Sequence, residues 1–169
     1  MRLAYPVDID QAEDGITITC PDVPGMVTGG WGDLAANLAA APEALAIALS
    51  QYVDDEHRLP TPSAADGRPV VAVPLLASAK LALHEAKLAS KLSNVELARR
   101  LGVDEKEVRR LLNVMHNSRM NQIEAALRAL DCHLVVDVER AAYTISSCHV
   151  RPSLAIMATE AVGPQVPAV

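Results

Sequence analysis

The segment that decides the fold is "SNVELARRLGVDEKEVRRLL" (Ser93–Leu112), because it predicts two short helices on either side of a tight turn. Ser93 followed by Glu96 has the spacing of a capping box, and so has Asp104 followed by Glu107. In this motif the first side chain accepts hydrogen bonds from the backbone N–H groups that open a helix. Each half of the segment therefore carries its own helix-start signal.

The turn and the apolar positions of this segment support the same reading. Gly102 stands where the chain must leave the first helix, in a left-handed conformation that favours glycine. Ala98 is small where the second helix approaches the first. Four apolar residues at helical spacing should form a shared core: Leu97, Leu101, Val108 and Leu111. The segment predicts a helix-turn-helix, and an ordinary helical hairpin without a nucleic-acid role is the alternative.

The charge of the chain is distributed unevenly. The net charge of the 169 residues is −6, but residues 1–70 hold three basic and eleven acidic residues, a balance of −8. Residues 71–130 hold ten basic and six acidic residues, a balance of +4, and residues 131–169 have −2. Screening confines electric fields to about 8–10 Å at physiological salt, so the basic middle can bind phosphate although the whole chain is acidic.

Composition excludes several classes of protein. No apolar run approaches the roughly 18 residues that a membrane helix needs, and "MRLAYPVDIDQAEDG" is too acidic for a signal peptide. The three cysteines (Cys20, Cys132 and Cys148) are odd in number and lack the spacing of metal ligands, as do the five dispersed histidines. We expect a cytoplasmic protein with idle or buried thiols and without cofactor or metal.

The first 73 residues predict an α+β unit. Strand-like segments bounded by turn residues are Arg2–Ile9, Gly15–Cys20, Met26–Trp31 and Pro69–Val73. Asp33 predicts the start of a helix whose apolar face, from Leu34 to Tyr52, should lie on the sheet. Pro42 costs roughly 3 kcal/mol in an unkinked helix, so we expect a kink or a break before it. Trp31 is expected to pack against the sheet.

From Pro74 the pattern becomes helical. "LLASAKLALHEAKLASKL" precedes the helix-turn-helix, and Met120–Leu130 follows it, with Asn121 and Glu124 repeating the capping spacing. Four or five short helices of this kind resemble the lambda-repressor-like, Xre-type DNA-binding domain. Cys132–Val138 is a candidate last strand, and the rest of the chain to Val169, rich in Pro and small residues, is expected to be partly disordered.

The order of several unrelated motifs resembles one known family. These motifs are "YPVDI", "GITITCPDVPGMVTGG", an Ala/Leu-rich helix, "LPTPS", "VAVPLLASAKLAL" and "ELARRLG". Together they cover roughly residues 1–138 and look like HicB antitoxins of the subgroup that carries a helix-turn-helix. Pro42 departs from the helix-forming residue that is usual at that place, and residues 139–169 are not part of the resemblance.

This resemblance implies a bacterial type II toxin–antitoxin system. Residues 1–73 would form a partial RNase H-like domain that neutralises a HicA-type toxin, a small mRNA interferase. Residues 74–138 would form the helix-turn-helix domain that binds operator DNA and represses the operon, with residues 139–169 as a tail. Such antitoxins act as homodimers or higher homo-oligomers. The charge agrees independently, because an acidic half suits a basic partner and a basic half suits phosphate.

The resemblance also points to individual residues. In the Xre-type pattern, the positions that meet base edges are those of Glu105, Lys106 and Arg110, although an acid at position 105 is a departure. Phosphate contacts are expected from Asn94, Arg109, Asn113 and Arg119. For the toxin, the acidic residues near turns are the candidates, namely Asp22, Asp54, Asp55 and Glu56. Residues 1–70 are expected to suffice for toxin binding, and "HLVVDV" (133–138) is a candidate for pairing across the dimer axis.

Two other classes of function compete with this one. Asp8 and Asp10 lie two residues apart on a predicted strand and so share a face, with Glu13, Asp14 and Asp22 nearby. Such carboxylates could hold Mg²⁺ for nucleic-acid hydrolysis, as in a working RNase H-like site, but they border a hairpin turn, and we expect no enzyme. The third class is an interaction module that has lost DNA binding.

Overall fold

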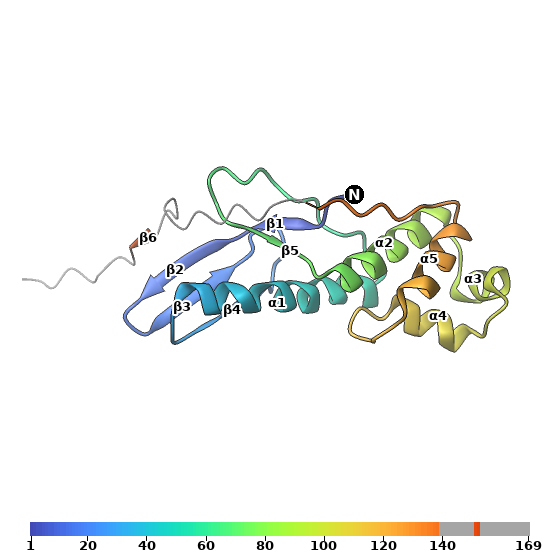
Figure 1. The fold of residues 1–169 in the computed structure, drawn as a ribbon, viewed down its shortest axis with the longest axis horizontal. Helices are drawn as coiled ribbons and strands as arrows, with labels where there is room; N and C mark the ends of the chain where they lie inside the picture. Colours follow the sequence, from blue (N-terminus) through green and yellow to red (C-terminus); the bar gives the residue numbers. More distant parts are fainter. Residues whose placement is uncertain (139–150, 153–169) are drawn as a thin grey trace, which may run out of the picture.

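The computed structural model describes residues 1–138 and 151–152, and it is a mixed α+β structure. A small sheet with one long helix lies at one end of an elongated molecule, and four shorter helices lie at the other (Figure 1). No helix in the described part is long and apolar enough to cross a membrane.

The predicted first strand is in fact two strands with different partners. β1 (Ala4–Pro6) pairs antiparallel with β5 (Val70–Ala72), whereas β2 (Asp8–Ala12) pairs antiparallel with β3 (Gly15–Thr19). Val7, between them, donates its backbone N–H to the carbonyl oxygen of Pro69 at 2.9 Å. The strand therefore changes partner at Val7, which a local pattern does not reveal.

The larger sheet has the order β4-β3-β2-β6. β4 (Val27–Gly30) pairs antiparallel with β3, and the short β6 (Arg151–Pro152) lies parallel to β2. The expected third and fourth strands are both confirmed, as β4 and β5, and β5 pairs with β1 in a separate two-stranded sheet. The pairing of β6 was not expected, and residues 139–150 and 153–169, to which the prediction of partial disorder also applies, lie outside the described residues.

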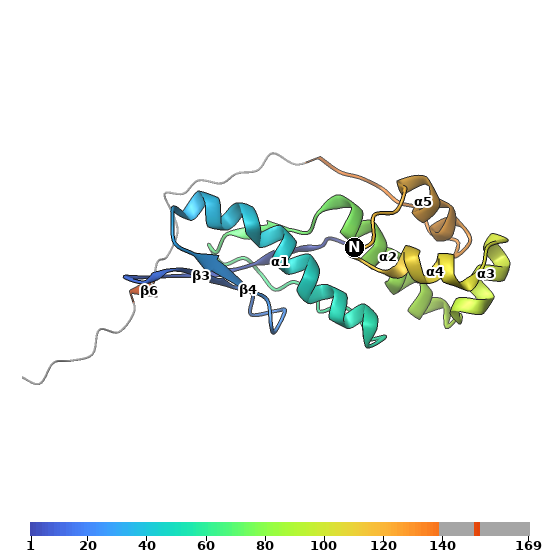
Figure 2. The ribbon, with the colours of Figure 1, turned by 90° about the horizontal axis from the view of Figure 1, so that it is seen from below.

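α1 (Leu34–Asp54) covers one face of this sheet (Figure 2). Asp33 caps it as predicted, since its Oδ1 accepts from the N–H of Ala36 at 2.6 Å. Of the kink or break expected before Pro42, the break does not occur, because the helix runs through this residue as one element. Ala41 and Leu45, on either side, are fully buried in the same core. We infer that their packing offsets the hydrogen bond that proline cannot donate.

The opposite face of the sheet is open. The side chains of Asp10 and Thr17, which face each other across the β2–β3 ladder, are exposed, whereas Ile9 is buried under α1. Trp31, at the end of β4, does not pack against the sheet, since 80% of its surface is exposed. That prediction is wrong.

The helical region begins with α2 (Leu75–Ser90), followed by α3 (Asn94–Leu101) and α4 (Glu105–Leu112). The capping box at Ser93 is complete, because Ser93 Oγ accepts from the N–H of Glu96, and Glu96 Oε2 accepts from the N–H of Ser93. Gly102 ends α3 with φ of +66°, as the sequence predicts. The α3–α4 turn thus forms for the local reasons that the sequence shows.

The last helix and the segment after it differ from the prediction. The N-cap of α5 (Met120–Arg128) is Arg119, two residues before the expected Asn121, and Gln122 Oε1 accepts from the N–H of Arg119 at 3.3 Å. Glu124, expected to complete a capping box with Asn121, instead pairs with Arg128 one turn later. Residues 132–138 form no strand in this structure, because no neighbouring strand supplies a ladder.

Two hydrophobic cores meet along α2. One contains the sheet, α1 and two α2 residues, Ala77 and Leu81. The other contains the predicted helix-turn-helix core, in which Leu97, Val108 and Leu111 are buried and Leu101 is partly buried. Ala79 and Leu83 of α2 belong to this second core. The boundary at residues 73/74 stays a prediction, but α2 packs into both cores.

Candidate functional site

The exposed side of α4 carries the basic residues that the sequence singled out. Lys106, Arg109 and Arg110 are exposed, while Val108 and Leu111 are buried against α3 and α5. The amphipathic spacing of "EKEVRRLL" produces this division, since residues three and four apart share a face of a helix. α4 therefore presents cations to solvent along its whole length.

Two ion pairs on α4 bind the arginines to acids of the same helix. Glu105 Oε1 lies 2.7 Å from Arg109 Nη2, and Glu107 Oε2 lies 3.5 Å from Arg110 Nη1. Exposed pairs of this kind are worth only about 0.3–0.5 kcal/mol, so a phosphate or a base can displace them. In the unbound protein the pair with Arg109 neutralises the Glu105 carboxylate.

The second capping box is only half formed. Asp104 Oδ1 accepts from the N–H of Glu107 at 2.7 Å, but Glu107 does not return a hydrogen bond. Its Oε1 instead accepts from Gln122 Nε2 on α5 at 3.2 Å. Glu107 therefore ties the start of α5 to α4 rather than closing its own cap.

The residues predicted to contact phosphate have different surroundings. Asn113 follows α4, and its Oδ1 accepts from the N–H groups of Met115 and His116 at 3.0 and 3.1 Å. Arg119 is exposed. Asn94 opens α3, and its buried Oδ1 has no hydrogen-bond partner within the described part of the chain.

Asn94 also lies close to the predicted base-reading helix. It lines a hollow of about 470 Å³ together with Glu105, the first residue of α4. The first residues of α3 and α4 therefore line the same hollow. The side-chain oxygen of Asn113 is occupied by the turn that follows α4, so only its side-chain NH₂ group is free to contact a phosphate.

A buried lysine that the sequence analysis did not single out holds the end of α4. Lys80 on α2 has no exposed surface, and its Nζ donates to Arg110 O at 3.0 Å, Asn113 O at 2.7 Å and Ser118 Oγ at 2.8 Å. Burial lowers the pKa of Lys80 to about 8. All three ammonium hydrogens are used, and two of the acceptors lie where a helix leaves carbonyls unpaired.

One signal in the sequence could have indicated this role. Lys80 stands three residues after Ala77 and four before His84, so it falls on the buried face of the predicted helix. A lysine at such a position needs acceptors from elsewhere in the chain. The sequence does not show which acceptors these are.

The four predicted toxin-contacting acids are not equivalent. Asp22 Oδ2 accepts from the N–H and the Oγ of Ser63 at 2.9 and 3.0 Å, so this carboxylate holds a loop. Glu56 Oε1 lies 2.9 Å from Lys87 Nζ, and this partner lowers the pKa of Glu56. Asp54 and Asp55 are exposed and have no ion pair among the described residues.

Three side chains of α2 contact the segment that carries Glu56. Besides the pair with Lys87, His84 Nε2 donates to the carbonyl oxygen of His57 at 2.8 Å. Glu85 Oε1 accepts from the N–H of Leu59 at 2.7 Å. The end of α1 and the first turn after it are therefore fixed against α2.

The carboxylates of the nuclease alternative share a face, as predicted. Asp8 and Asp10 both lie on β2, and Asp8 Oδ1 is 3.9 Å from Arg68 Nη1. Within residues 1–138 and 151–152, no group of three His, Cys, Asp or Glu side chains is arranged to hold a metal ion. Cys20 is buried and Cys132 half-buried, whereas Cys148 lies outside the described residues.

Comparison with known proteins shows which family of proteins this chain belongs to. Residues 4–82 match the family model described as HicB_like antitoxin of bacterial toxin–antitoxin system. Antitoxin HicB 2 of Photorhabdus laumondii is 38% identical over 133 residues, which cover 79% of this chain and 94% of that protein. Antitoxin HicB of Pseudomonas fluorescens is 34% identical over 139 residues, 81% of this chain and 94% of the relative.

A third relative extends the likeness to another genus. Antitoxin HicB of Escherichia coli K12 is 33% identical over 130 residues, 76% of this chain and 94% of that protein. This chain belongs to the HicB-like antitoxin family. The family consists of antitoxins and not of enzymes, so the nuclease alternative has no support.

Proposed function

We propose that this chain is the antitoxin of a HicA/HicB-type toxin–antitoxin system. It neutralises an mRNA interferase by direct binding and represses its own operon by binding operator DNA. The observation that carries the proposal is the likeness to proteins named Antitoxin HicB over almost their whole length. The separation of an acidic sheet region from a basic helical region supports the assignment of one partner to each.

In this proposal α3 and α4 form an Xre-type helix-turn-helix, and α4 enters the major groove. Glu105, Lys106 and Arg110 read base edges. Once Arg109 leaves Glu105 to meet a phosphate, the Glu105 carboxylate can accept a hydrogen bond from a cytosine amino group. Because the ion pairs on α4 are exposed, their loss costs little compared with a charge-assisted contact to DNA. Asn94, Asn113 and Arg119 contact phosphates around this helix and fix its register.

A single helix-turn-helix covers few base pairs, so we propose a two-fold dimer on a palindromic operator. Its half-sites are centred about 34 Å apart, or a multiple of that distance. The segment "HLVVDV" supports this proposal, since Val135 and Val138 are 85% and 89% exposed. Two copies of an unpaired apolar segment can pair across a dyad and remove that surface from water.

The toxin-binding half is the sheet with α1, for which we propose the partial RNase H-like fold. A fragment of residues 1–70 lacks Ala77 and Leu81, which complete this core, and the α2 side chains that hold residues 56–59. The test of toxin binding therefore needs the full chain, because failure of the short fragment could reflect loss of folding.

The experiment has two arms on the purified full-length chain. In the first, the product of a neighbouring HicA-type gene is assayed for RNA cleavage with and without an equimolar amount of the chain. In the second, binding to DNA from upstream of the operon is compared with binding to scrambled DNA. Suppressed cleavage with operator preference supports the proposal, and suppressed cleavage without any DNA binding identifies the interaction module instead.

A further inference from the structure

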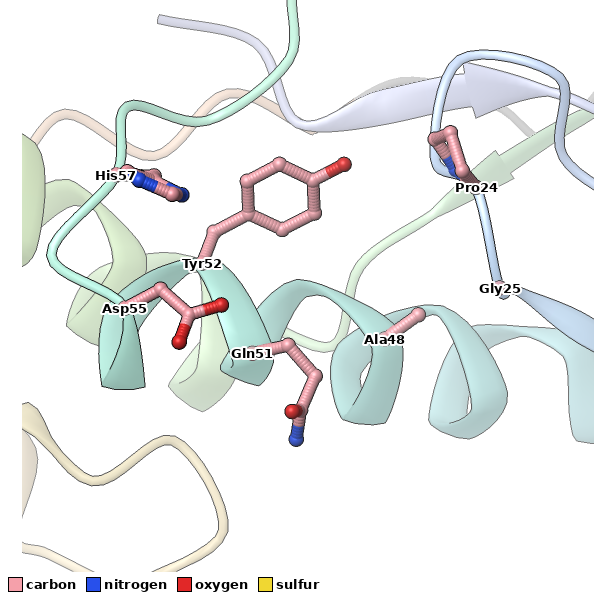
Figure 3. A pocket seen from close by; sticks show the side chains of 7 residues that line it. All are labelled: Pro24, Gly25, Ala48, Gln51, Tyr52, Asp55 and His57. Atoms are coloured by element: carbon pink, nitrogen blue, oxygen red, sulfur yellow. The ribbon is translucent and has the colours of Figure 1, made fainter.

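A pocket beside the end of α1 has the chemistry of a receptor for a cationic side chain. The pocket has a volume of about 350 Å³ and lies between the turn at Pro24 and Gly25 and the last two turns of α1 (Figure 3). Known small-molecule sites range from about 300 to 1,000 Å³. The pocket is at the low end of this range, which suits one protruding side chain.

The pocket combines an aromatic ring with a carboxylate. Figure 3 shows the ring of Tyr52 at its centre, with Asp55 and His57 on one side and Pro24 on the other. Asp55 is exposed and forms no ion pair with the described residues. The face of an aromatic ring attracts a cation by about 0.5–2 kcal/mol, and a carboxylate adds a charge-assisted hydrogen bond.

The walls of the pocket are fixed in place. The N–H of His57 donates to Tyr52 O at 2.8 Å, and the carbonyl oxygen of His57 accepts from His84 on α2. The backbone N–H of Asp55 donates to the carbonyl oxygen of Gln51 at 2.9 Å. On the other side, a Cβ added at Gly25 would meet no atom within 4 Å, so the entrance is open there.

Charge decides which kind of side chain fits. Residues 1–70 have a net charge of −8, which attracts cations and repels acids. An apolar side chain would remove water from the Asp55 carboxylate without replacing its hydrogen bonds. Of the four acids near turns, Asp22 and Glu56 already have partners, which leaves Asp55 as the carboxylate that lines a pocket and is free to bind.

We infer that this pocket receives a lysine or arginine side chain of the toxin. The inference rests on the proposed antitoxin function and deepens it, because it places one contact of the complex at Tyr52 and Asp55. The cation lies over the Tyr52 ring and pairs with the Asp55 carboxylate. Gln51 on the exposed rim contributes its amide oxygen.

The test uses the full-length chain and the purified product of the neighbouring HicA-type gene, with the dissociation constant measured at about 0.15 M salt. Asp55→Asn and Gln51→Lys should each weaken binding at least tenfold. The matched control Asp54→Asn, whose side chain does not line the pocket, should change it by less than threefold, whereas Gln51→Glu adds a carboxylate at the rim and should tighten binding. Tyr52→Phe keeps the ring and should bind like wild type, whereas Tyr52→Leu should lose about fivefold or more.

The results distinguish a failure of the pocket proposal from a failure of the proposed antitoxin function. All changed positions except Tyr52 are exposed, and thermal unfolding of each variant checks that it folds. If wild type binds the toxin and both Asp55→Asn and Gln51→Lys bind equally well, the pocket is not the contact. Equal losses in Asp54→Asn and Asp55→Asn also overturn the pocket, because the contact is then a diffuse acidic surface. If wild type shows no binding, the proposed function itself fails.

Discussion

The Nζ of Lys80 on α2 donates a hydrogen bond to the backbone carbonyl oxygen of Asn113, at 2.7 Å, just beyond the end of α4. The same nitrogen also binds Arg110 O inside the helix and Ser118 Oγ in the loop that follows. A buried cation at the negative end of the helix dipole therefore fixes both α4 and the 113–118 loop to α2. Removing it takes one hydrogen bond from each of these three acceptors.

Replacement of Lys80 by methionine should destabilise the protein by about 1–3 kcal/mol. Methionine fills a similar volume and avoids the cost of a buried charge, but it removes three hydrogen bonds from a charged donor. Arg110 O and Asn113 O then keep only the hydrogen bonds from Ser118 Oγ at 3.4 Å and from the His116 N–H at 3.1 Å. Lys91→Met changes an exposed lysine near the end of the same helix and should cost less than 0.5 kcal/mol. Denaturant titration gives the free energies of unfolding. Faster amide exchange confined to residues 113–118 would locate the effect, and unchanged exchange there would contradict it.

The stability of the protein should also depend on pH through Lys80. Its pKa is about 8 in the folded protein, against 10.5 for a free side chain. Between these values the unfolded chain binds the proton and the folded protein does not, so the free energy of unfolding rises with pH. Relative to Lys80→Met, wild type should gain about 1–2 kcal/mol between about pH 7.5 and 9.5. Parallel pH curves for the two proteins would show that Lys80 does not titrate in this range.

Arg110 and Arg119 should differ in how they contribute to DNA binding. Arg110→Ala should cost about 1–3 kcal/mol on the operator and relax the preference at one base pair, because the proposed contact is to a base edge. Arg119→Ala should weaken operator and scrambled DNA alike and lower the salt dependence by about one unit, because the proposed contact is to phosphate. Binding titrations at several salt concentrations measure both effects. Intact operator preference in Arg110→Ala would exclude α4 as the reading helix, and toxin neutralisation serves as the control for folding.

Gly29 in β4 should tolerate no side chain. A Cβ at this position would lie 2.0 Å from the carbonyl oxygen of Ile16 in the paired strand, and the residue has φ of +147°. Gly32 also has positive φ, at +121°, but an added Cβ there meets nothing within 4 Å. Gly29→Ala should therefore cost about 3 kcal/mol or more, and Gly32→Ala only about 1 kcal/mol of backbone strain. If the two variants lose the same stability in thermal or denaturant unfolding, backbone strain and not the clash with Ile16 explains why β4 needs glycine at position 29.

Features that depend on neighbours in the sequence were predictable. The capping box at Ser93, the left-handed Gly102 and the core of the α3–α4 pair follow from spacings of three and four residues. The exposure of Lys106 and Arg110 follows from the same periodicity. Each of these depends on atoms within one or two helical turns, which the local sequence specifies.

Features that depend on distant partners were not predictable. The strand changes partner at Val7 because of Pro69, and Lys80 is buried because Asn113 and Ser118 supply acceptors more than 30 residues away. The same holds for Asp22, which is a toxin-contact candidate because it is acidic and near a turn, since the local sequence does not show its partner Ser63, 41 residues further along. The helix does not break at Pro42, and we infer that core packing outweighs the local penalty there.

The division of α2 between two cores has a consequence for building chimaeras. If the proposed DNA-binding region were transplanted at residue 74, Ala77 and Leu81 would leave the sheet core that they complete. The α2 side chains that hold residues 56–59 would leave with them. A hybrid with a new operator preference should therefore keep α2 entire and change only the exposed positions of α4. In this proposal, operator specificity is changed by substitutions on the exposed face of α4 and not by exchange of the whole helical region.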